Sequence, residues 1–289
     1  MIGQIMRTKI LFLAALFVAS AAMAAGPETS SVDLDAYRKA YFVSVTTGSD
    51  KSGKGTKAAP WASIGNALAK ARGRSVAILV AGGTYPEHSL QMRKGTALYG
   101  GFDADDWTRD IRASRTTIDA QGQGRVLVAA DDARLDGFEI RGGLVRGPGG
   151  GVFIEGTSPV LTNNTFTANK TLGPENWAPQ HWHETAHDGG AVYCTGGGSP
   201  VVRNNLFAGN HTDNGRGAGL GYDGRCNGEI TDNVFIDNVA GLDDPMRSSD
   251  GGALSIFRWS APVSYTHLTL PTIPRWCSSR WSAYQYKRG

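Results

Sequence analysis

A repeated unit within residues 149–257 constrains the fold of this chain more than any other feature. Residues 149–169 read GGGVFIEGTSPVLTNNTFTAN, and residues 189–210 repeat the pattern as GGAVYCTGGGSPVVRNNLFAGN. A looser copy covers residues 217–238, and a fourth begins at residues 251–257 as GGALSIF. A unit of this size, with two short β runs and glycine or asparagine corners, cannot bury its apolar face alone. The repeat therefore predicts a solenoid of stacked coils.

Alignment of the copies brings one phenylalanine and two asparagines of each unit into coincidence. The coinciding sets are Phe166, Phe207 and Phe235; Asn164, Asn205 and Asn233; and Asn169, Asn210 and Asn238. Parallel coils stack about 4.8 Å apart, so equivalent residues lie above one another. We therefore expect an inward stack of the phenylalanine rings and a corner ladder of Asn169, Asn210 and Asn238, each amide bonding the neighbouring coil. We interpret these asparagines as structural.

The residues before the repeat continue the same rhythm of short strands and polar corners. Short apolar runs lie at residues 41–45, 76–85, 90–102 and 116–143. Strands of this length between Asn and Gly corners favour parallel coils over hairpins. Residues 61–72 (WASIGNALAKAR) instead place apolar side chains on one helical face. This helix is expected to cover the open first coil, whose strand edges would otherwise be exposed.

The N-terminus has the pattern of a secretory signal peptide over residues 1–24. Arg7 and Lys9 supply the positive region, Ile10–Ser20 the apolar core, and AMA at residues 22–24 the cleavage site. The apolar run is too short to span a bilayer. We therefore expect a mature chain without a transmembrane helix, secreted, periplasmic or on the cell surface. Residues 25–40 are expected to be a polar leader, either as a short helix, as the spacing of Leu34, Tyr37 and Tyr41 allows, or as a loose segment.

The C-terminus has the pattern of a non-native tail. Residues 263–272 (VSYTHLTLPT) back-translate without mismatch to a string that resembles the transposon-end adapter used in short-read library preparation. The fourth coil should also continue after SAP at residues 260–262, as the earlier coils do after SPV. The sequence therefore predicts a β-helix over residues 41–262, truncated at its C-terminus, and an artefact over residues 263–289.

Several motifs resemble a known group of proteins. VAGGTYPE (80–87), TTIDAQG (116–122), LDGFEIRGG (135–143) and the repeat units look like right-handed parallel β-helix proteins of the pectate-lyase-like superfamily. Within it, the likeness is to secreted β-helix repeat proteins with a domain of unknown function near the N-terminus, and polymorphic outer-membrane repeat proteins look similar too. The resemblance covers roughly residues 41–262 and implies an all-β, right-handed parallel β-helix with an N-terminal helical cap. It specifies chemistry weakly, because the superfamily holds lyases, hydrolases and adhesins.

The first insertion between coils, residues 170–188, is the richest in functional side chains. It carries the candidate ligand-binding residues Trp177, His181, Trp182, His183 and His187. Indole rings can stack on the apolar faces of sugars, which favours a glycan contact surface. The three histidines could instead ligate a metal through neutral imidazoles. Both interpretations remain open from the sequence.

The second and third insertions, residues 211–216 and 240–250, contribute charged side chains. The candidates here are Asp213, Arg216, Asp243 and Asp244. Such groups can bond sugar hydroxyls, and paired carboxylates can hydrolyse a glycosidic bond or bind Ca²⁺. The formal net charge of +3 is too small to indicate a nucleic-acid partner.

These features predict a secreted β-helix repeat protein that contacts extracellular polysaccharide or a cell-surface glycan through its insertions, without an identifiable catalytic set. The alternatives are a polysaccharide lyase or glycoside hydrolase on the same face, and a structural surface adhesin. Cys194 and Cys226 lie in neighbouring coils. A disulfide between them and two free buried thiols are both compatible with the sequence.

Overall fold

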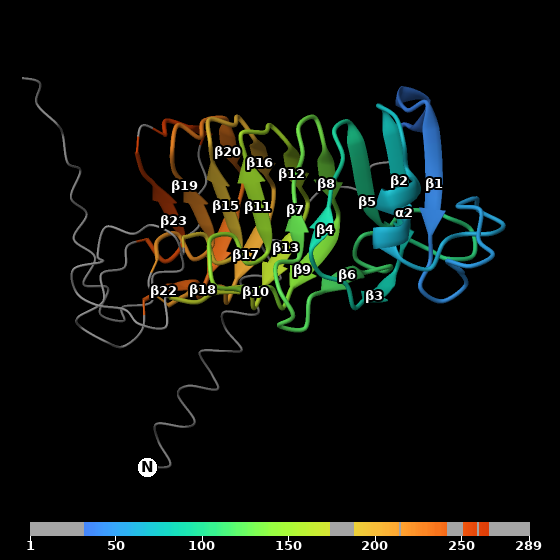
Figure 1. Cartoon of the computed structure of the whole chain (residues 1–289), viewed down its shortest axis with the longest axis horizontal. Coiled ribbons are helices and arrows are strands. Elements are labelled where there is room, and N and C mark those ends of the chain that lie inside the picture. The colour runs from blue at the N-terminus through green and yellow to red at the C-terminus, as the bar shows by residue number, and fades with distance from the viewer. Residues whose placement is uncertain (1–31, 174–187, 214, 242–250, 259, 266–289) are drawn as a thin grey trace, which may run out of the picture.

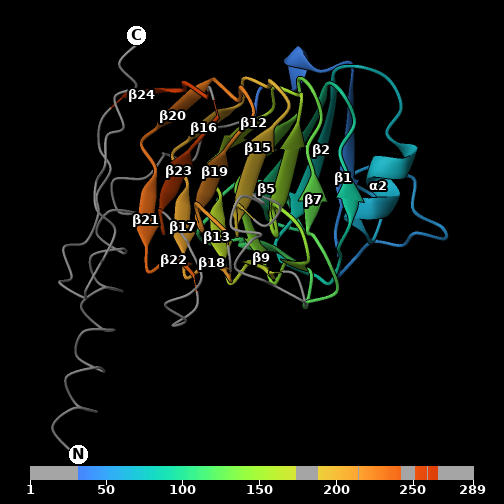
Figure 2. The same ribbon diagram turned by 60° about the vertical axis from the view of Figure 1, so that its left-hand side comes forward.

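The protein is a parallel β-helix in the computed structural model, which describes residues 32–173, 188–213, 215–241, 251–258 and 260–265. Successive coils stack along one axis, so that four sheets surround a common core (Figures 1 and 2). Every pairing between the described strands is parallel, which confirms the predicted all-β parallel β-helix.

We number the sheets by their order within a coil. Sheet 1 contains β1 (Lys39–Val43), β2 (Val76–Ala81), β5 (Thr96–Phe102), β8 (Arg134–Asp136), β12 (Val160–Thr162), β16 (Val201–Arg203), β20 (Glu229–Thr231) and β24 (Val263–Tyr265). Sheet 2 contains β3 (Gly83–Tyr85), β6 (Thr116–Asp119), β9 (Phe138–Arg141), β13 (Thr165–Thr167), β17 (Leu206–Ala208) and β21 (Val234–Ile236). Sheet 3 contains β10 (Leu144–Val145), β14 (Lys170–Thr171), β18 (His211–Thr212) and β22 (Val239–Ala240). Sheet 4 contains β4 (Leu90–Gln91), β7 (Leu127–Val128), β11 (Val152–Glu155), β15 (Val192–Thr195), β19 (Leu220–Tyr222) and β23 (Leu254–Ile256).

The predicted phenylalanine stack is confirmed. Phe166 pairs in register with Phe207, and Phe207 with Phe235. Neighbouring ring centroids lie 4.8 and 4.7 Å apart, and the ring planes are nearly parallel. All three side chains are buried. The repeat thus sets the register of sheet 2, because the phenylalanine keeps the same spacing from the two asparagines of its unit, so that equivalent residues stack one above another.

The asparagine ladder is also confirmed, and a second one runs beside it. Asn169 donates from its backbone N–H and its Nδ2 to Oδ1 of Asn210, at 3.1 and 3.0 Å. Asn210 donates in the same way to Oδ1 of Asn238, at 3.1 and 2.8 Å. The second ladder contains Asn164, Asn205 and Asn233 with the same pattern. These amides satisfy backbone groups at two corners of every repeated coil.

Asn210→Ala is expected to lower the free energy of unfolding by about 1–3 kcal/mol, because it leaves the buried N–H of Asn169 and the buried carbonyl of Phe166 unpaired. Chemical denaturation measures this loss. The control is Asn66→Ala, which removes a single exposed hydrogen bond to Asp50 and should cost much less. Equal losses in the two variants would contradict the structural role of the ladder.

The N-terminal residues join the fold earlier than predicted. β1 begins at Lys39, and a single 3₁₀ turn, η1 (Leu34–Ala36), precedes it. Val32, Leu34 and Tyr37 of the predicted leader pack against a second apolar cluster on the outer side of sheet 1. This cluster contains Phe42, Ala77, Leu79, Ala81, Ala97, Tyr99, Phe102 and Trp107. The leader packs here because the apolar side chains on the outer side of sheet 1 would otherwise be exposed to water.

The helix predicted at residues 61–72 is observed as α2 (Ile64–Lys70). Ser63 caps its N-terminus, and Ile64, Ala67 and Leu68 are buried in the main core. The helix packs against β1 and β4 near the N-terminal end of the solenoid (Figure 1). Its function as a cap stays a prediction.

A short strand, β24, follows Pro262, the last residue of the predicted β-helix. β24 pairs in register with β20, so residues 263–265 continue sheet 1 past Pro262. Valine and tyrosine suit a strand whatever the origin of the segment. Residues 266–289 and the signal segment 1–24 lie outside the described residues, and their interpretation stays a prediction. Within the described ranges, no helix has the length and hydrophobicity needed to cross a bilayer.

Candidate functional site

The three insertions leave the solenoid at one corner, between sheet 3 and sheet 4. They begin in β14, β18 and β22 and end before β15, β19 and β23. β14, β18 and β22 are hydrogen-bonded neighbours, as are β15, β19 and β23. The departure and return points of the insertions therefore stack in consecutive coils.

Most of the predicted site residues lie in the insertions outside the described residues. These are Trp177, His181, Trp182, His183, His187, Asp243 and Asp244. The glycan and metal interpretations of these side chains therefore stay predictions. Asp213 and Arg216 lie in the described part of the second insertion and can be placed.

Asp213 links neighbouring coils at the departure corner. Its Oδ1 lies 2.8 Å from Nζ of Lys170, the first residue of β14. Nε2 of His211 lies 3.7 Å from the same oxygen. The backbone N–H of Asp213 also donates to the carbonyl of Thr171. Asp213 thus joins the starting points of the first two insertions.

A glycine at the start of each repeat lets the returning segment fold onto the outer face of sheet 4. The four glycines have φ between +61° and +68°, namely Gly149, Gly189, Gly217 and Gly251. A Cβ on Gly189 would lie 2.6 Å from Cβ of Tyr193. Only glycine adopts this conformation and this approach readily. The repeat spacing thereby brings Asp188 and Arg216, which precede Gly189 and Gly217, against sheet 4.

Asp188 and Asp223 meet at this face with one tyrosine and two arginines, which we call the carboxylate cluster. Oδ1 of Asp188 accepts the backbone N–H of Arg216 at 2.7 Å. The Tyr193 hydroxyl donates to Oδ2 of Asp223 at 3.1 Å. Nε of Arg258 lies 3.3 Å from Oδ1 of Asp223. Residues from three consecutive coils thus converge beside the insertion corner.

Burial controls the ionisation of this cluster. Asp188 and Asp223 are both buried, each with only 3% of its surface exposed. Desolvation raises the pKa of Asp188 to about 7, against the lowering effects of the Arg216 N–H and charge, while Asp223 raises it further. Desolvation and the Asp223 charge also raise the pKa of Tyr193. Near neutral pH, Asp188 therefore exchanges a proton while buried.

An aromatic row extends from the cluster along the outer face of sheet 4. The rings of Phe153 and Tyr193 are stacked, with centroids 6.1 Å apart and planes 5° apart. The Arg125 guanidinium carbon lies 4.6 Å from the Phe153 centroid. On the other side, Arg216 lies 4.0 Å from the Phe257 centroid, and Phe257 is 41% exposed. This face offers flat apolar rings together with hydrogen-bonding groups.

Sequence reasoning did not select Tyr193, Asp223 or Asp188 as site residues. Strand pairing aligns Tyr193 with Phe153, and it places Asp223 in line with the polar residues Thr195 and Glu155. The sequence therefore offered little signal, because these residues follow the repeat. The difference is burial: Glu155 is exposed and Thr195 is half-buried, whereas Asp223 is buried, and a buried carboxylate needs an explanation beyond the solenoid pattern.

The described residues hold no group of three or more His, Cys, Asp or Glu that could bind a metal ion. The predictions of a histidine-bound metal and of Ca²⁺ at acidic corners therefore depend on residues outside the described ranges.

Comparison with known proteins places the chain in a family. Residues 46–255 match the family described as "Protein of unknown function (DUF1565)". The chain belongs to the DUF1565 family. This match covers the described coils of sheets 1 to 4 almost completely. No curated protein matches this DUF1565 chain.

Two solved structures resemble the DUF1565 chain distantly. The crystal structure of pectate lyase Pel9A is 14% identical, with a TM-score of 0.46, and the match covers 79% of this chain and 62% of the lyase. The pectin methylesterase from Aspergillus niger is 12% identical, with a TM-score of 0.29, over 82% of this chain and 87% of the esterase. The parallel strand pairings, rather than these matches, establish the β-helix. The likeness to outer-membrane repeat proteins stays a prediction.

Proposed function

We propose that this DUF1565 protein contacts extracellular polysaccharide through the outer face of sheet 4 and the adjoining insertion corner. The observation that carries the proposal is the convergence of three stacked insertion points, the aromatic row and the carboxylate cluster. Solenoids commonly bind extended ligands along such stacked surfaces. The predicted signal peptide supports an extracellular setting.

The side chains of this face suit sugar rings. Phe153 is half-buried and presents a flat ring beside Arg125. The apolar faces of sugars stack on aromatic rings, and hydroxyl groups pair with charged side chains such as Arg216. Trp177 and Trp182, in the first insertion, extend the same proposal to residues outside the described ranges.

A screen of plant and bacterial polysaccharides immobilised on an array tests this function. Phe153→Ala is expected to weaken binding by roughly 1–3 kcal/mol, by analogy with the stacking of bases on aromatic rings. Trp177→Ala combined with Trp182→Ala is expected to weaken binding further. The control is Tyr37→Ala, which removes a half-buried ring on the outer side of sheet 1. Isothermal titration calorimetry with the best array ligand measures each loss.

The proposal fails if the wild-type protein binds no polysaccharide on the array. It also fails if Phe153→Ala, with an unchanged circular-dichroism spectrum, binds as tightly as the wild type. A protein that folds but binds nothing would favour the structural adhesin.

Polysaccharide lyase or hydrolase activity is the second candidate, and the carboxylate cluster favours it. Asp188 and Asp223 lie in one cluster, and burial raises the pKa of Asp188 to about 7. A carboxyl group whose pKa lies near neutral pH can donate and accept protons, which acid–base catalysis requires. Release of reducing ends from the array ligand, or the ultraviolet absorbance of an unsaturated product, distinguishes cleavage from binding alone.

A further inference from the structure

We infer that the disulfide between Cys194 and Cys226 positions Asp223 in the carboxylate cluster, and that its loss loosens this cluster while the coils stay intact. The inference rests on the proposed function for its binding measurement alone. Its structural measurement is independent of any ligand.

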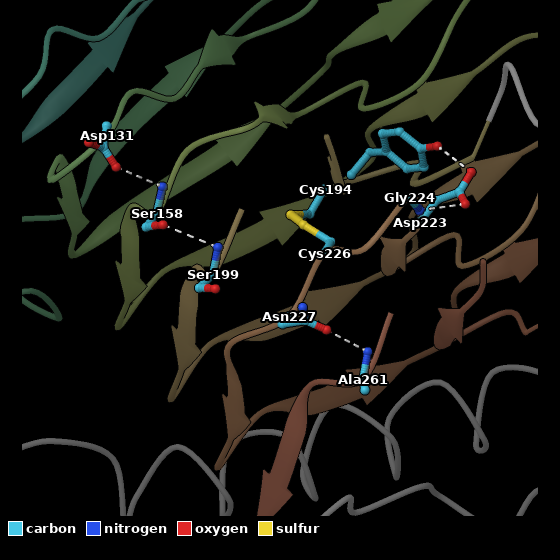
Figure 3. Close-up of a disulfide and its surroundings, with 10 residues drawn as sticks. Asp131, Ser158, Cys194, Ser199, Asp223, Gly224, Cys226, Asn227 and Ala261 are labelled. Carbon is cyan, nitrogen blue, oxygen red and sulfur yellow. Dashed lines mark hydrogen bonds between the residues drawn. A yellow bond between two sulfur atoms is a disulfide. The ribbon is translucent and has the colours of Figure 1, made fainter. Parts of the chain in front are cut away.

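The disulfide joins neighbouring coils from inside the core. Cys194 lies in β15, Cys226 lies in the corner formed by residues 223–228, and both are buried. Their Cα atoms are 5.9 Å apart, which is within the usual range for a disulfide. Figure 3 shows the bond beside the segment that carries Asp223 and Gly224. The sulfurs therefore attach this corner to the preceding coil.

The corner holds β15 from both of its faces. Adjacent residues of a strand point to opposite sides. Cys194 points into the core and bonds Cys226, whereas Tyr193 points outward and donates to Asp223 at 3.1 Å. Asp223 also donates its backbone N–H to the carbonyl of Cys194 at 2.9 Å. Removal of the disulfide leaves these two hydrogen bonds and the pairing of β19 with β15 to hold Asp223.

The backbone of this corner needs such a restraint. Gly224, Arg225 and Gly228 have φ values of +61°, +67° and +112°. The left-handed conformation is unfavourable for arginine because of its Cβ. The Gly224 N–H donates to Oδ1 of Asp223 at 2.7 Å, and the Cys226 N–H to the Asp223 carbonyl at 3.3 Å. Asp223 thus organises the turn that the disulfide anchors.

Neither cysteine belongs to the repeat pattern. Ile154 pairs with Cys194 in the preceding coil, and Tyr222 pairs with it in the following coil. The register of β16 with β20 places Cys226 above Gly198. The disulfide therefore occurs at the corner that carries Asp223 and not at the equivalent corner one coil earlier. The disulfide is therefore a feature of the Asp223 corner, whereas the stacking contacts of the repeat stabilise the coils in general.

The test compares amide hydrogen exchange in the wild type and in Cys194→Ala/Cys226→Ala, measured by mass spectrometry on the full chain. Peptides that cover residues 223–228 are expected to exchange at least tenfold faster in the double variant. Peptides that cover β17 are expected to change less than twofold. The control is Val202→Ala, which truncates a buried side chain on β16, the next strand along the chain. Exchange in each protein is measured at the same number of degrees below its own melting temperature.

Unchanged exchange at residues 223–228 would overturn the inference. So would an equal acceleration of β17, or an equal acceleration of the corner in Val202→Ala, because the disulfide would then stabilise the whole fold without positioning Asp223. If the double variant does not fold, wild-type protein refolded in excess reductant provides the same measurement.

Binding of the best array polysaccharide gives the second readout. The double variant is expected to bind at least fivefold more weakly, as is Asp223→Asn, which keeps the disulfide. Faster exchange of the corner with no polysaccharide bound by any protein would sink the proposed function and leave the inference standing. Unchanged exchange with intact binding would overturn the inference alone.

Discussion

Phe207→Ala is expected to lower the free energy of unfolding by about 3–5 kcal/mol, the usual range for a large-to-small change in a core. The Phe207 side chain is fully buried, with Phe166 at 4.8 Å on one side and Phe235 at 4.7 Å on the other. Truncation removes both ring contacts and leaves a cavity between two coils. Urea denaturation followed by circular dichroism measures the loss.

Leu206→Ala is the matched control, because Leu206 precedes Phe207 on β17 and is only half-buried on the opposite face. It is expected to cost less than half as much. A neutral Phe207→Ala, or a larger loss in Leu206→Ala, would show that the assigned inward and outward faces of sheet 2 are wrong.

Asp188→Asn is expected to stabilise the fold at high pH. The pKa of Asp188 is about 7 in the folded protein, and its ordinary value is 3.8. The folded state therefore binds the proton more tightly, and the protein loses stability as pH rises from about 4 to about 7. At about 1.4 kcal/mol per pKa unit, the loss is roughly 4 kcal/mol. An asparagine has no such loss and can still accept the Arg216 N–H.

Denaturation of wild type and variant at about pH 4 and about pH 8 measures this effect. The two proteins should differ little at the lower pH, and the variant should be the more stable at the higher pH. Asp131→Asn is the control, because the hydrogen bond and charge of Lys94 lower the pKa of Asp131. Its effect should have the opposite sign and be smaller. A variant of Asp188 that is less stable than wild type at pH 8 would contradict the buried, protonatable carboxyl.

The repeat made the solenoid predictable, because Phe207 and Asn210 have to coincide with their counterparts before any core can form. The candidate site was less predictable because its residues occupy ordinary positions of the repeat. Tyr193 aligns with Phe153, and Asp223 lies in line with the polar residue Thr195. Only the folded return segment at Gly189 brings Asp188 beside them.

The disulfide shows the same limit. The sequence places Cys226 four positions beyond Cys194 in the next coil, an offset that argues against bonding along an extended strand. The corner at residues 223–228 turns the chain back, so that the two Cα atoms are 5.9 Å apart. A turn that depends on left-handed backbone at Gly224 and Arg225 is a three-dimensional property that a linear alignment does not contain.

The asparagine ladders have a direction along the solenoid axis. Each Oδ1 accepts from the preceding coil, and each Nδ2 donates to a carbonyl of the preceding coil, as Asn210 does to Phe166. Substitution of Asn210 therefore leaves a backbone N–H and a carbonyl of the preceding coil without their partners. In the following coil, Oδ1 of Asn238 loses the Nδ2 donor but keeps the backbone N–H of residue 210. The loss is therefore larger on the N-terminal side of the substituted corner. In a chain built from nearest-neighbour contacts, a mutated coil should fray together with its predecessor, while its successor stays ordered.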